Sequence, residues 1–239
     1  MYLSEHGLVD SRSDAKRFIT SGSVCVDGKF IVKPAFDVSG DEEIRVDKSS
    51  KKYVSRGGLK LEFAISAFDV NVDDALALDI GASSGGFTDC LLKSGARHVI
   101  AVDSGYGQMV EALRLNERVT VIENYNARYM TPSDFDYIPN LAVMDVSFIS
   151  AKLIIPSVSN VLAVGGDFIC LIKPQFEVGK NGLGKGGIVK NDALRKRAVD
   201  DVIECAGICG FETLGIIESP ITGGDGNIEF LAHFKKRQF

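Results

Sequence analysis

Short apolar runs alternate with helix-like segments from about residue 56 onward, and this alternation limits the possible folds more than any other feature. Five apolar runs are predicted to be strands: residues 75–80, 98–103, 119–122, 141–145 and 167–172. Four segments are predicted to be helices: residues 85–94, 108–115, 151–161 and 191–208. Because parallel neighbours are joined by crossovers that are usually helical, the alternation predicts an α/β fold with a mainly parallel sheet covered on both faces.

The carboxyl-terminal part of the chain departs from this alternation. Residues 212–218 and 226–234 have strand patterns, and the turn that joins them is rich in Pro and Gly, with no helix between them. Two strands connected in this way pair as an antiparallel hairpin. We therefore expect the parallel sheet to finish in an antiparallel pair.

The first 48 residues have the pattern of a separate small α+β unit. Ser11 is a suitable helix cap before an amphipathic segment, and Asp27-Gly28 is a strong hairpin signal inside residues 23–32. Residues 43–46 alternate as a third strand. A chain of 239 residues, 45% of them hydrophobic, is long enough for a small and a large domain. The predicted organisation is a domain over residues 1–48, a linker over 49–55 and a domain over 56–239.

Composition and spacing argue against several classes of protein. The longest apolar region, residues 141–172, is interrupted by charged side chains and lacks the ~20 clean residues of a membrane-spanning helix. Polar and charged residues also interrupt the amino terminus, so no secretory signal is expected. The five cysteines form no CxxC pair and the three histidines are scattered. We therefore expect free thiols in a reducing cytoplasm, and no metal site.

Basic residues are concentrated in two stretches of a chain whose formal net charge is −5. Residues 48–60 hold five Lys or Arg and no acid, and residues 173–197 hold seven Lys or Arg against two acids. Such stretches match the footprint of a phosphate backbone, although an ordinary solvated surface has the same composition. Candidates for contact with a phosphate backbone are Lys51, Lys52 and Arg56 of the first stretch and, from the amphipathic segment near the amino terminus, Arg12, Lys16 and Arg17.

A glycine-rich turn follows the strand predicted at residues 75–80. The segment LDIGASSGGFT has an acid at the strand end and three glycines before a helix: Asp79, Gly81, Gly85 and Gly86. Glycines let a ligand approach the backbone, and Asp103 ends the next strand, where a ribose hydroxyl would be recognised. Three interpretations remain open: a dinucleotide site in which Ser83 replaces the second glycine of GxGxxG, a methyl-donor site, and a structural turn without a ligand.

A second glycine-rich segment, residues 179–185, matches the phosphate-loop pattern GxxxxGK. Gly186 follows it, whereas that motif requires Ser or Thr as a magnesium ligand at this position. No helix is predicted to begin directly after the segment. We interpret residues 177–190 as a flexible basic loop over a site.

Two lysines and two acids occupy positions that suit catalysis. Asp145 and Lys173 end neighbouring apolar strands, and the carboxyl ends of parallel strands share the edge that carries the glycine turn. Lys60 follows the linker, and Glu229 lies in the last predicted strand. Taken singly, Lys60 fits a surface helix and Glu229 an exposed strand face.

Together these four residues could activate a weak nucleophile such as a ribose 2′-hydroxyl. A lysine acts as a base near neutral pH only if its pKa falls, and a second ammonium group nearby lowers that pKa. We therefore expect Lys173 to be the base or steering group, with its pKa lowered by Lys60. The carboxylates would hold the two lysines in place.

Seven segments, in their order and spacing, resemble the TlyA family: SRGGLKL, LDIGASSGGFTD, AVDSGYGQ, RVTVIENYNAR, DVSFIS, IKPQFEVG and GNIEF. These proteins are S-adenosylmethionine-dependent ribosomal RNA 2′-O-methyltransferases, often named haemolysins. The resemblance covers essentially the whole chain and implies a Rossmann-like methyltransferase domain of the FtsJ type. The segment SRSDAKRFITSGSVCVDG resembles an S4-like RNA-binding domain. Ribosomal subunits, with cytidines of ribosomal RNA as targets, are the implied partners, and no membrane partner is implied.

The resemblance also assigns roles to individual residues. The Lys-Asp-Lys-Glu catalytic set of FtsJ-type enzymes falls on Lys60, Asp145, Lys173 and Glu229. The pocket for S-adenosylmethionine would be lined by Gly81, Ser83, Gly85, Phe87, Asp103, Asn124 and Asp145, and the acid and third glycine of the same turn, Asp79 and Gly86, are assigned to it as well.

The amino terminus departs from the family pattern, and two functions compete with methyl transfer. Members of the family usually begin with a further basic and apolar helical stretch before the segment that opens here at Tyr2, so we expect weaker docking on RNA. A membrane-lytic protein, as the haemolysin name suggests, would show long apolar or strongly amphipathic segments. A ribosome-binding module with an inactive catalytic half would show an eroded donor pocket. Neither signature is visible in the sequence.

Overall fold

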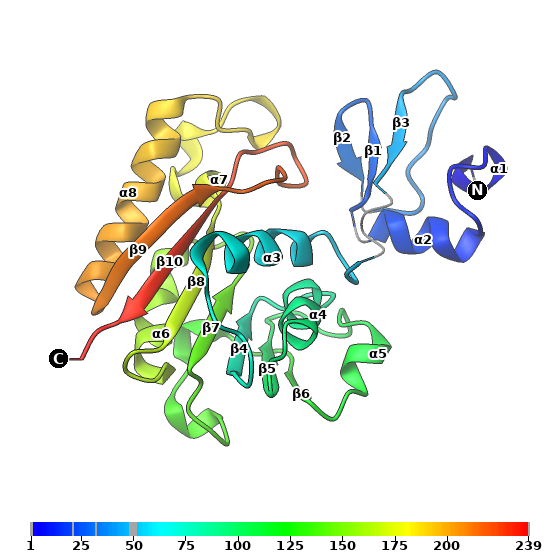
Figure 1. Ribbon diagram of the computed structural model, residues 1–239. Coiled ribbons are helices and arrows are strands. Elements are labelled where there is room, and N and C mark those ends of the chain that lie inside the picture. Colours follow the sequence, from blue (N-terminus) through cyan, green and yellow to red (C-terminus); the bar gives the residue numbers. More distant parts are fainter. Residues whose placement is uncertain (1, 21, 32, 48–51, 239) are drawn as a thin grey trace.

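The structure is a computed structural model that describes residues 2–20, 22–31, 33–47 and 52–238. It consists of a large α/β domain with a smaller amino-terminal region beside it (Figure 1). The strands are β1 (Val24–Val26), β2 (Lys29–Ile31), β3 (Ile44–Val46), β4 (Leu76–Ile80), β5 (His98–Val102), β6 (Val119–Ile122), β7 (Leu141–Met144), β8 (Asp167–Ile172), β9 (Phe211–Glu218) and β10 (Phe230–Lys236).

Helices connect these strands in the pattern that the sequence predicts. The α-helices are α1 (Tyr2–Glu5), α2 (Arg12–Thr20), α3 (Gly57–Phe68), α4 (Gly86–Lys93), α5 (Glu111–Arg114), α6 (Ile155–Val161), α7 (Pro174–Glu177) and α8 (Asp192–Ile208). Short 3₁₀ helices are η2 (Ala127–Tyr129), η3 (Pro132–Asp134), η4 (Ala151–Leu153), η5 (Lys180–Gly182) and η6 (Lys185–Gly187).

Seven strands of the large domain form one sheet in the order β6-β5-β4-β7-β8-β10-β9. The five strands from β6 to β8 pair in parallel, and β10 runs antiparallel to both β8 and β9. The predicted α/β fold and its terminal antiparallel hairpin are therefore confirmed. The strand order reverses between β4 and β7, and open parallel sheets bind ligands at such a switch point.

Helices cover both faces of this sheet because its strands are apolar on both sides. Ala77 and Leu78 are neighbours in β4, yet they point to opposite faces and belong to different buried clusters. Leu61 of α3 lies in the first cluster, which also holds buried residues of α4. Val202 of α8 lies in the second cluster, together with buried residues of α6.

Three local departures from the predicted elements have clear physical causes. Helix α3 was not among the predicted helices, because its first residues are two glycines, which are poor helix formers. The segment predicted as one helix over residues 151–161 is divided into η4 and α6, with Pro156 in the first turn of α6. The last strand starts at Phe230, so Glu229 precedes β10 instead of lying within a strand.

The amino-terminal region has its own small sheet, in the order β2-β1-β3, with antiparallel pairing throughout. Helix α2 covers this sheet and places Ala15, Phe18 and Ile19 in a core with Val24 and Val26. The predicted hairpin turns at Asp27 and Gly28, both with positive φ. Lys48 to Lys51, where the predicted linker begins, lie outside the described residues.

Membrane-spanning helices and metal-binding clusters are both absent from the described part of the chain. No helix in it is long and apolar enough to cross a membrane. It contains no group of three or more His, Cys, Asp or Glu residues arranged to hold a metal ion. Its five cysteines are all free thiols.

Candidate active site

A cavity of about 600 Å³ lies at the carboxyl ends of β4, β5 and β7, at the reversal of strand order. Each strand delivers polar residues there because its apolar part is buried in the sheet and the chain turns at its end. Lining residues include Gly81, Ser83, Asp103, Gln108, Asn126 and Asp145. The glycine turn, Asp103 and Asp145, predicted separately from the sequence, thus meet at one site.

The glycine turn has a backbone shape that only small residues allow. Gly81 has a φ of +84°, and a Cβ atom there would collide with the backbone carbonyl oxygen of Asp145. Ser83 donates its backbone N–H to Asp103 over 2.8 Å, and Gly105 donates to the other oxygen of that carboxylate over 2.6 Å. Asp103 therefore fixes the turns after β4 and β5 relative to each other.

The charges around the cavity discriminate between the ligand classes left open by the sequence. Two carboxylates, Asp103 and Asp145, line it, against one cationic side chain, Arg128. A pyrophosphate would be repelled by the carboxylates, whereas a cationic sulfonium compound would not. The residues present therefore fit S-adenosylmethionine better than a dinucleotide. Gly81 and Ser83 of the glycine turn line this cavity, and the Asp103 carboxylate provides hydrogen-bond acceptors in it.

A second cavity of about 240 Å³ adjoins the first and contains the lysines. Gly81, Ser83, Asp145 and Ser147 line both cavities. The second cavity is lined in addition by Ser55, Arg56, Lys60, Gly86, Phe87 and Lys173. A donor in the first cavity and an acceptor group in the second would meet beside Asp145.

Two nearly buried ion pairs hold the four predicted catalytic residues together. Lys173 Nζ lies 2.5 Å from Asp145 Oδ1 and donates to Ser147 Oγ over 2.8 Å. Lys60 Nζ donates to Glu229 Oε2 over 2.5 Å, and the Glu229 side chain is only 2% exposed. Neither Lys60 nor Glu229 is thus the exposed surface residue that its local pattern alone suggests.

The structure corrects the expectation that Lys60 lowers the pKa of Lys173. Burial does lower this pKa, but the carboxylates of Asp145 and Glu229 outweigh burial and raise it above its ordinary value. Burial raises the pKa of Asp145, but attraction to Lys173 and then Lys60 prevails and lowers it below its ordinary value. The prediction considered the effect of the second ammonium group on this pKa and gave too little weight to the opposite effect of the two carboxylates. In the free protein Lys173 is protonated.

Comparison with known proteins agrees with this geometry. The FtsJ-like methyltransferase family model matches residues 53–236, and the S4 domain model matches residues 1–44. A TlyA protein of Mycobacterium tuberculosis, a 16S/23S rRNA (cytidine-2′-O)-methyltransferase, is 42% identical over 95% of this chain and 85% of its own length. The chain belongs to the TlyA family of FtsJ-like methyltransferases.

Other members of the TlyA family match over similar lengths. YqxC of Bacillus subtilis, a candidate rRNA methyltransferase, is 46% identical over 97% of this chain and 83% of its own length. A solved structure of a candidate hemolysin from Streptococcus thermophilus is 43% identical, with a TM-score of 0.80. It covers 99% of this chain and 86% of its own. The family uses S-adenosylmethionine as its methyl donor.

Not all residues that the TlyA resemblance assigns to the donor pocket line the large cavity. Gly86 and Phe87 line the smaller cavity, and Gly85 lines neither of the two. Gly85 instead makes room for Leu113, which a Cβ atom at this position would meet. Asn124 is exposed and outside the lining, while its neighbours Tyr125 and Asn126 are part of it.

Asp79 lies beneath the glycine turn instead of in a cavity. It is fully buried, accepts a hydrogen bond from Thr88 Oγ1 over 2.6 Å, and its Oδ1 has no partner. Burial raises the pKa of Asp79 to about 7. Because Thr88 belongs to α4, the carboxylate ties this helix to the end of β4.

Replacing Asp79 by Asn is expected to change how stability depends on pH. The folded chain keeps a proton on Asp79 at pH values where the unfolded chain has released it, so this residue's contribution falls as pH rises from about 4 to about 7. The stability of Asp79→Asn relative to wild type should therefore increase by ~2–3 kcal/mol between about pH 5 and about pH 8. Denaturant unfolding of both proteins measures this, and an equal difference at both pH values would contradict it.

The predicted RNA-contacting residues are divided between two places. Arg12 and Lys16 are exposed on α2. Lys52 pairs with Glu62 of α3, and Arg56 is only 9% exposed, with its guanidinium 3.7 Å from the centre of the Phe30 ring. Arg56 thus joins the two parts of the chain instead of facing solvent. Lys51 and the side chain of Arg17 lie outside the described residues.

Sequence reasoning missed several polar residues of the site. Ser147 accepts a hydrogen bond from Lys173, and Gln108 accepts one from Ser83 Oγ over 3.0 Å. Ser55 lines the smaller cavity. All three lie inside segments that carry the TlyA resemblance, so the signal was present. Single serines and glutamines are too common in surface turns to be selected by pattern alone.

Proposed function

We propose that the chain transfers a methyl group from S-adenosylmethionine to the 2′-oxygen of a cytidine in ribosomal RNA. The observation that carries this proposal is the pair of nearly buried ion pairs at the junction of the two cavities. The named activity of the M. tuberculosis relative supplies the substrate class. Because ribosomal subunits are the substrate, we place the protein in the cytoplasm.

The larger cavity is the proposed donor site. S-adenosylmethionine supplies an electrophilic methyl group when it is bound. Gly81 and Ser83 form part of the cavity wall, and Asp103 orients the donor's ribose by accepting hydrogen bonds. Asp145, whose pKa is lowered, provides the negative charge that favours a sulfonium cation at the boundary between the cavities.

The smaller cavity is the proposed site of the target ribose. Lys173 is protonated in the free protein, so its ammonium group donates a hydrogen bond to the 2′-oxygen and aims it, and the hydroxyl proton is released to water as the bond between this oxygen and the methyl group forms. Asp145 and Ser147 fix the direction of that ammonium group. Lys60, held by Glu229, is a second lysine that lines this cavity. Steering is thus the role that the charges of the free protein support for Lys173.

Transfer of tritiated methyl groups to isolated ribosomal subunits tests the proposal. Purified protein, S-adenosylmethionine and each subunit are incubated separately, and the labelled RNA is digested to nucleosides. We expect the label in 2′-O-methylcytidine. Label on a base, or no label with either subunit, would contradict the proposed function. Two further measurements test the competing functions. An inactive ribosome-binding module would give no heat of binding in calorimetry with S-adenosylmethionine. A lytic protein would release dye from liposomes.

The exposed basic residues of α2 are proposed to dock on RNA phosphates. Replacing Arg12 and Lys16 by Ala should weaken RNA binding and reduce the slope of log affinity against log salt by about 2. Filter binding at several salt concentrations measures this slope. Replacing Lys235 and Arg237 by Ala removes the same charge from β10 and the segment after it, and it should leave the slope unchanged. Equal slopes for the two double variants would exclude α2 as the RNA-binding face.

A further inference from the structure

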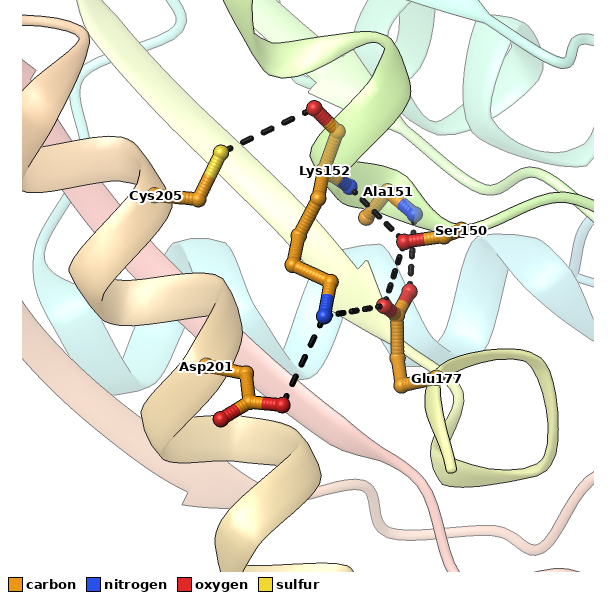
Figure 2. A network of polar contacts seen from close by, with 6 residues as sticks. All are labelled: Ser150, Ala151, Lys152, Glu177, Asp201 and Cys205. Atoms are coloured by element: carbon orange, nitrogen blue, oxygen red, sulfur yellow. Dashed lines mark hydrogen bonds and ion pairs between the residues drawn. The ribbon is translucent and has the colours of Figure 1, made fainter. Parts of the chain in front are cut away.

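Glu177 connects the loops that follow β7 and β8, although no role at the site has been assigned to it. Its carboxylate, 2% exposed, accepts hydrogen bonds from Ser150 Oγ over 2.5 Å and from the Ala151 backbone N–H over 2.7 Å (Figure 2). Lys152 Nζ lies 3.9 Å away. A buried carboxylate with two donors and a cation nearby is a well-satisfied anchor.

Lys173 connects the same two loops at a second point. Lys173 contacts Asp145 and Ser147 at the ends of β8 and β7. Glu177, one helical turn after Lys173, holds the far end of the other loop through Ser150. Residues 145–151 are therefore fixed at both ends by residues of a single short segment, 173–177.

The fixed loop carries a strained residue. Phe148 has a φ of +65°, which bulky side chains rarely adopt, and its side chain is exposed at the rim of the large cavity. Such a backbone conformation persists only where the surrounding structure determines it. One ring contact, to Phe176 at 5.4 Å, comes from the same segment as Glu177. Without the anchor at Ser150 and Ala151, the loop could relax toward ordinary backbone angles.

We propose that Glu177 is a positioning residue that keeps the loop of residues 145–151 in register with Lys173. The inference rests on the proposed function, because the loop delivers Asp145 and Ser147 to the site of transfer. Loss of the anchor would misplace these groups relative to Lys173. The glycine turn and Asp103, which recognise the donor from the other side of the large cavity, would keep their places.

The outer part of this network offers a matched control. Lys152 extends between Glu177 and Asp201 of α8, and its ammonium group is 3.5 Å from the Asp201 carboxylate (Figure 2). The side chains of Lys152 and Asp201 are both partly exposed, so their ion pair contributes little to the stability of the fold. Asp201→Asn removes a charge from the same network without touching the anchored loop.

Steady-state methyl transfer separates positioning from folding. We expect Glu177→Ala to lower kcat by roughly 30- to 100-fold and to raise the dissociation constant of S-adenosylmethionine by a smaller factor, at most about tenfold, because part of the anchored loop also lines the large cavity. Glu177→Gln keeps an acceptor for Ala151 and a polar group for Ser150, so it should recover kcat to within about fivefold of wild type. Asp201→Asn should have the same kcat and the same donor affinity as wild type. Melting temperatures of all variants show whether each is folded.

A readout without substrate tests the anchor itself. The chain contains no tryptophan, so Phe148→Trp introduces a single tryptophan in the loop, which can be excited selectively over the six tyrosines. Its anisotropy should be high with Glu177 present and should fall when Glu177→Ala is added, but not when Asp201→Asn is added. Should Glu177→Ala fail to fold, Ser150→Ala removes one bond of the same anchor and should lower the anisotropy in the same direction.

The two experiments distinguish failure of this inference from failure of the proposed function. If wild type transfers no methyl group, the proposed function fails, while the anisotropy still decides whether Glu177 fixes the loop. If wild type is active and Glu177→Ala has the same kcat, the positioning role is wrong. Equal losses in Glu177→Gln and Glu177→Ala, a loss of donor affinity as large as the loss of kcat, or unchanged anisotropy would each overturn it as well.

Discussion

Replacing Lys173 by Met should lower the rate of methyl transfer by roughly 10³-fold and leave donor affinity within about threefold of wild type. Methionine has nearly the length of lysine but cannot donate a hydrogen bond or carry charge. The 2′-oxygen would lose the ammonium group that aims it, and Asp145 would lose its partner at 2.5 Å. Single-turnover transfer to ribosomal subunits measures the rate, and calorimetry measures donor affinity.

The control for this variant is a lysine in another ion pair of the same sheet. Lys235 of β10 donates to Asp167 at the opposite end of β8 over 2.8 Å. Lys235→Met breaks an ion pair and removes one positive charge, as Lys173→Met does, but far from both cavities. We expect it to keep full activity. Turnover by Lys173→Met at the wild-type rate would remove Lys173 from the mechanism.

Replacing Gly81 by Ala should reduce donor affinity by roughly 100-fold, because the added methyl group must displace the backbone at Asp145. The obstacle is a main-chain carbonyl, which cannot rotate aside as a side chain can. Displacing it disturbs the wall between the two cavities and also the carboxylate that pairs with Lys173. Methyl transfer at low donor concentration should fall in proportion. Calorimetric titration with S-adenosylmethionine measures the effect directly.

Gly165 separates the steric effect from the cost of an unusual backbone angle. It has a φ of +72°, similar to that of Gly81, but a Cβ atom there would meet nothing within 4 Å. Gly165→Ala should therefore lose about 1 kcal/mol of stability and no donor affinity. If both alanine variants bind the donor as wild type does, the glycine turn is not the donor site.

The sequence predicted the parts of the site that depend on strand ends. The alternation of apolar runs and helices is a strong signal for a parallel sheet, and the carboxyl ends of such strands share one edge. Asp145 and Lys173 could therefore be placed together from the strand pattern alone, and they form an ion pair. Asp103 was placed beside the glycine turn by the same reasoning, and it does bond to that turn.

Contacts between residues distant in the chain could not be predicted in this way. Lys60 and Glu229 are 169 positions apart, and their pairing depends on α3 crossing the sheet near the start of β10. The direction of the pKa shift of Lys173 depends on how close two carboxylates approach, which periodicity does not encode. Arg56 appeared as one more basic residue, whereas the structure buries it against Phe30.

The position of β10 in the sheet has a consequence for the synthesis of the protein. This strand lies between β8 and β9, yet it is the last of the described strands to leave the ribosome. Until it is made, β8 lacks one of its neighbours, and the nascent Lys60 has no Glu229 to accept its hydrogen bond. A growing chain therefore cannot complete this group of ion pairs until the segment that holds Glu229 and β10 has been made.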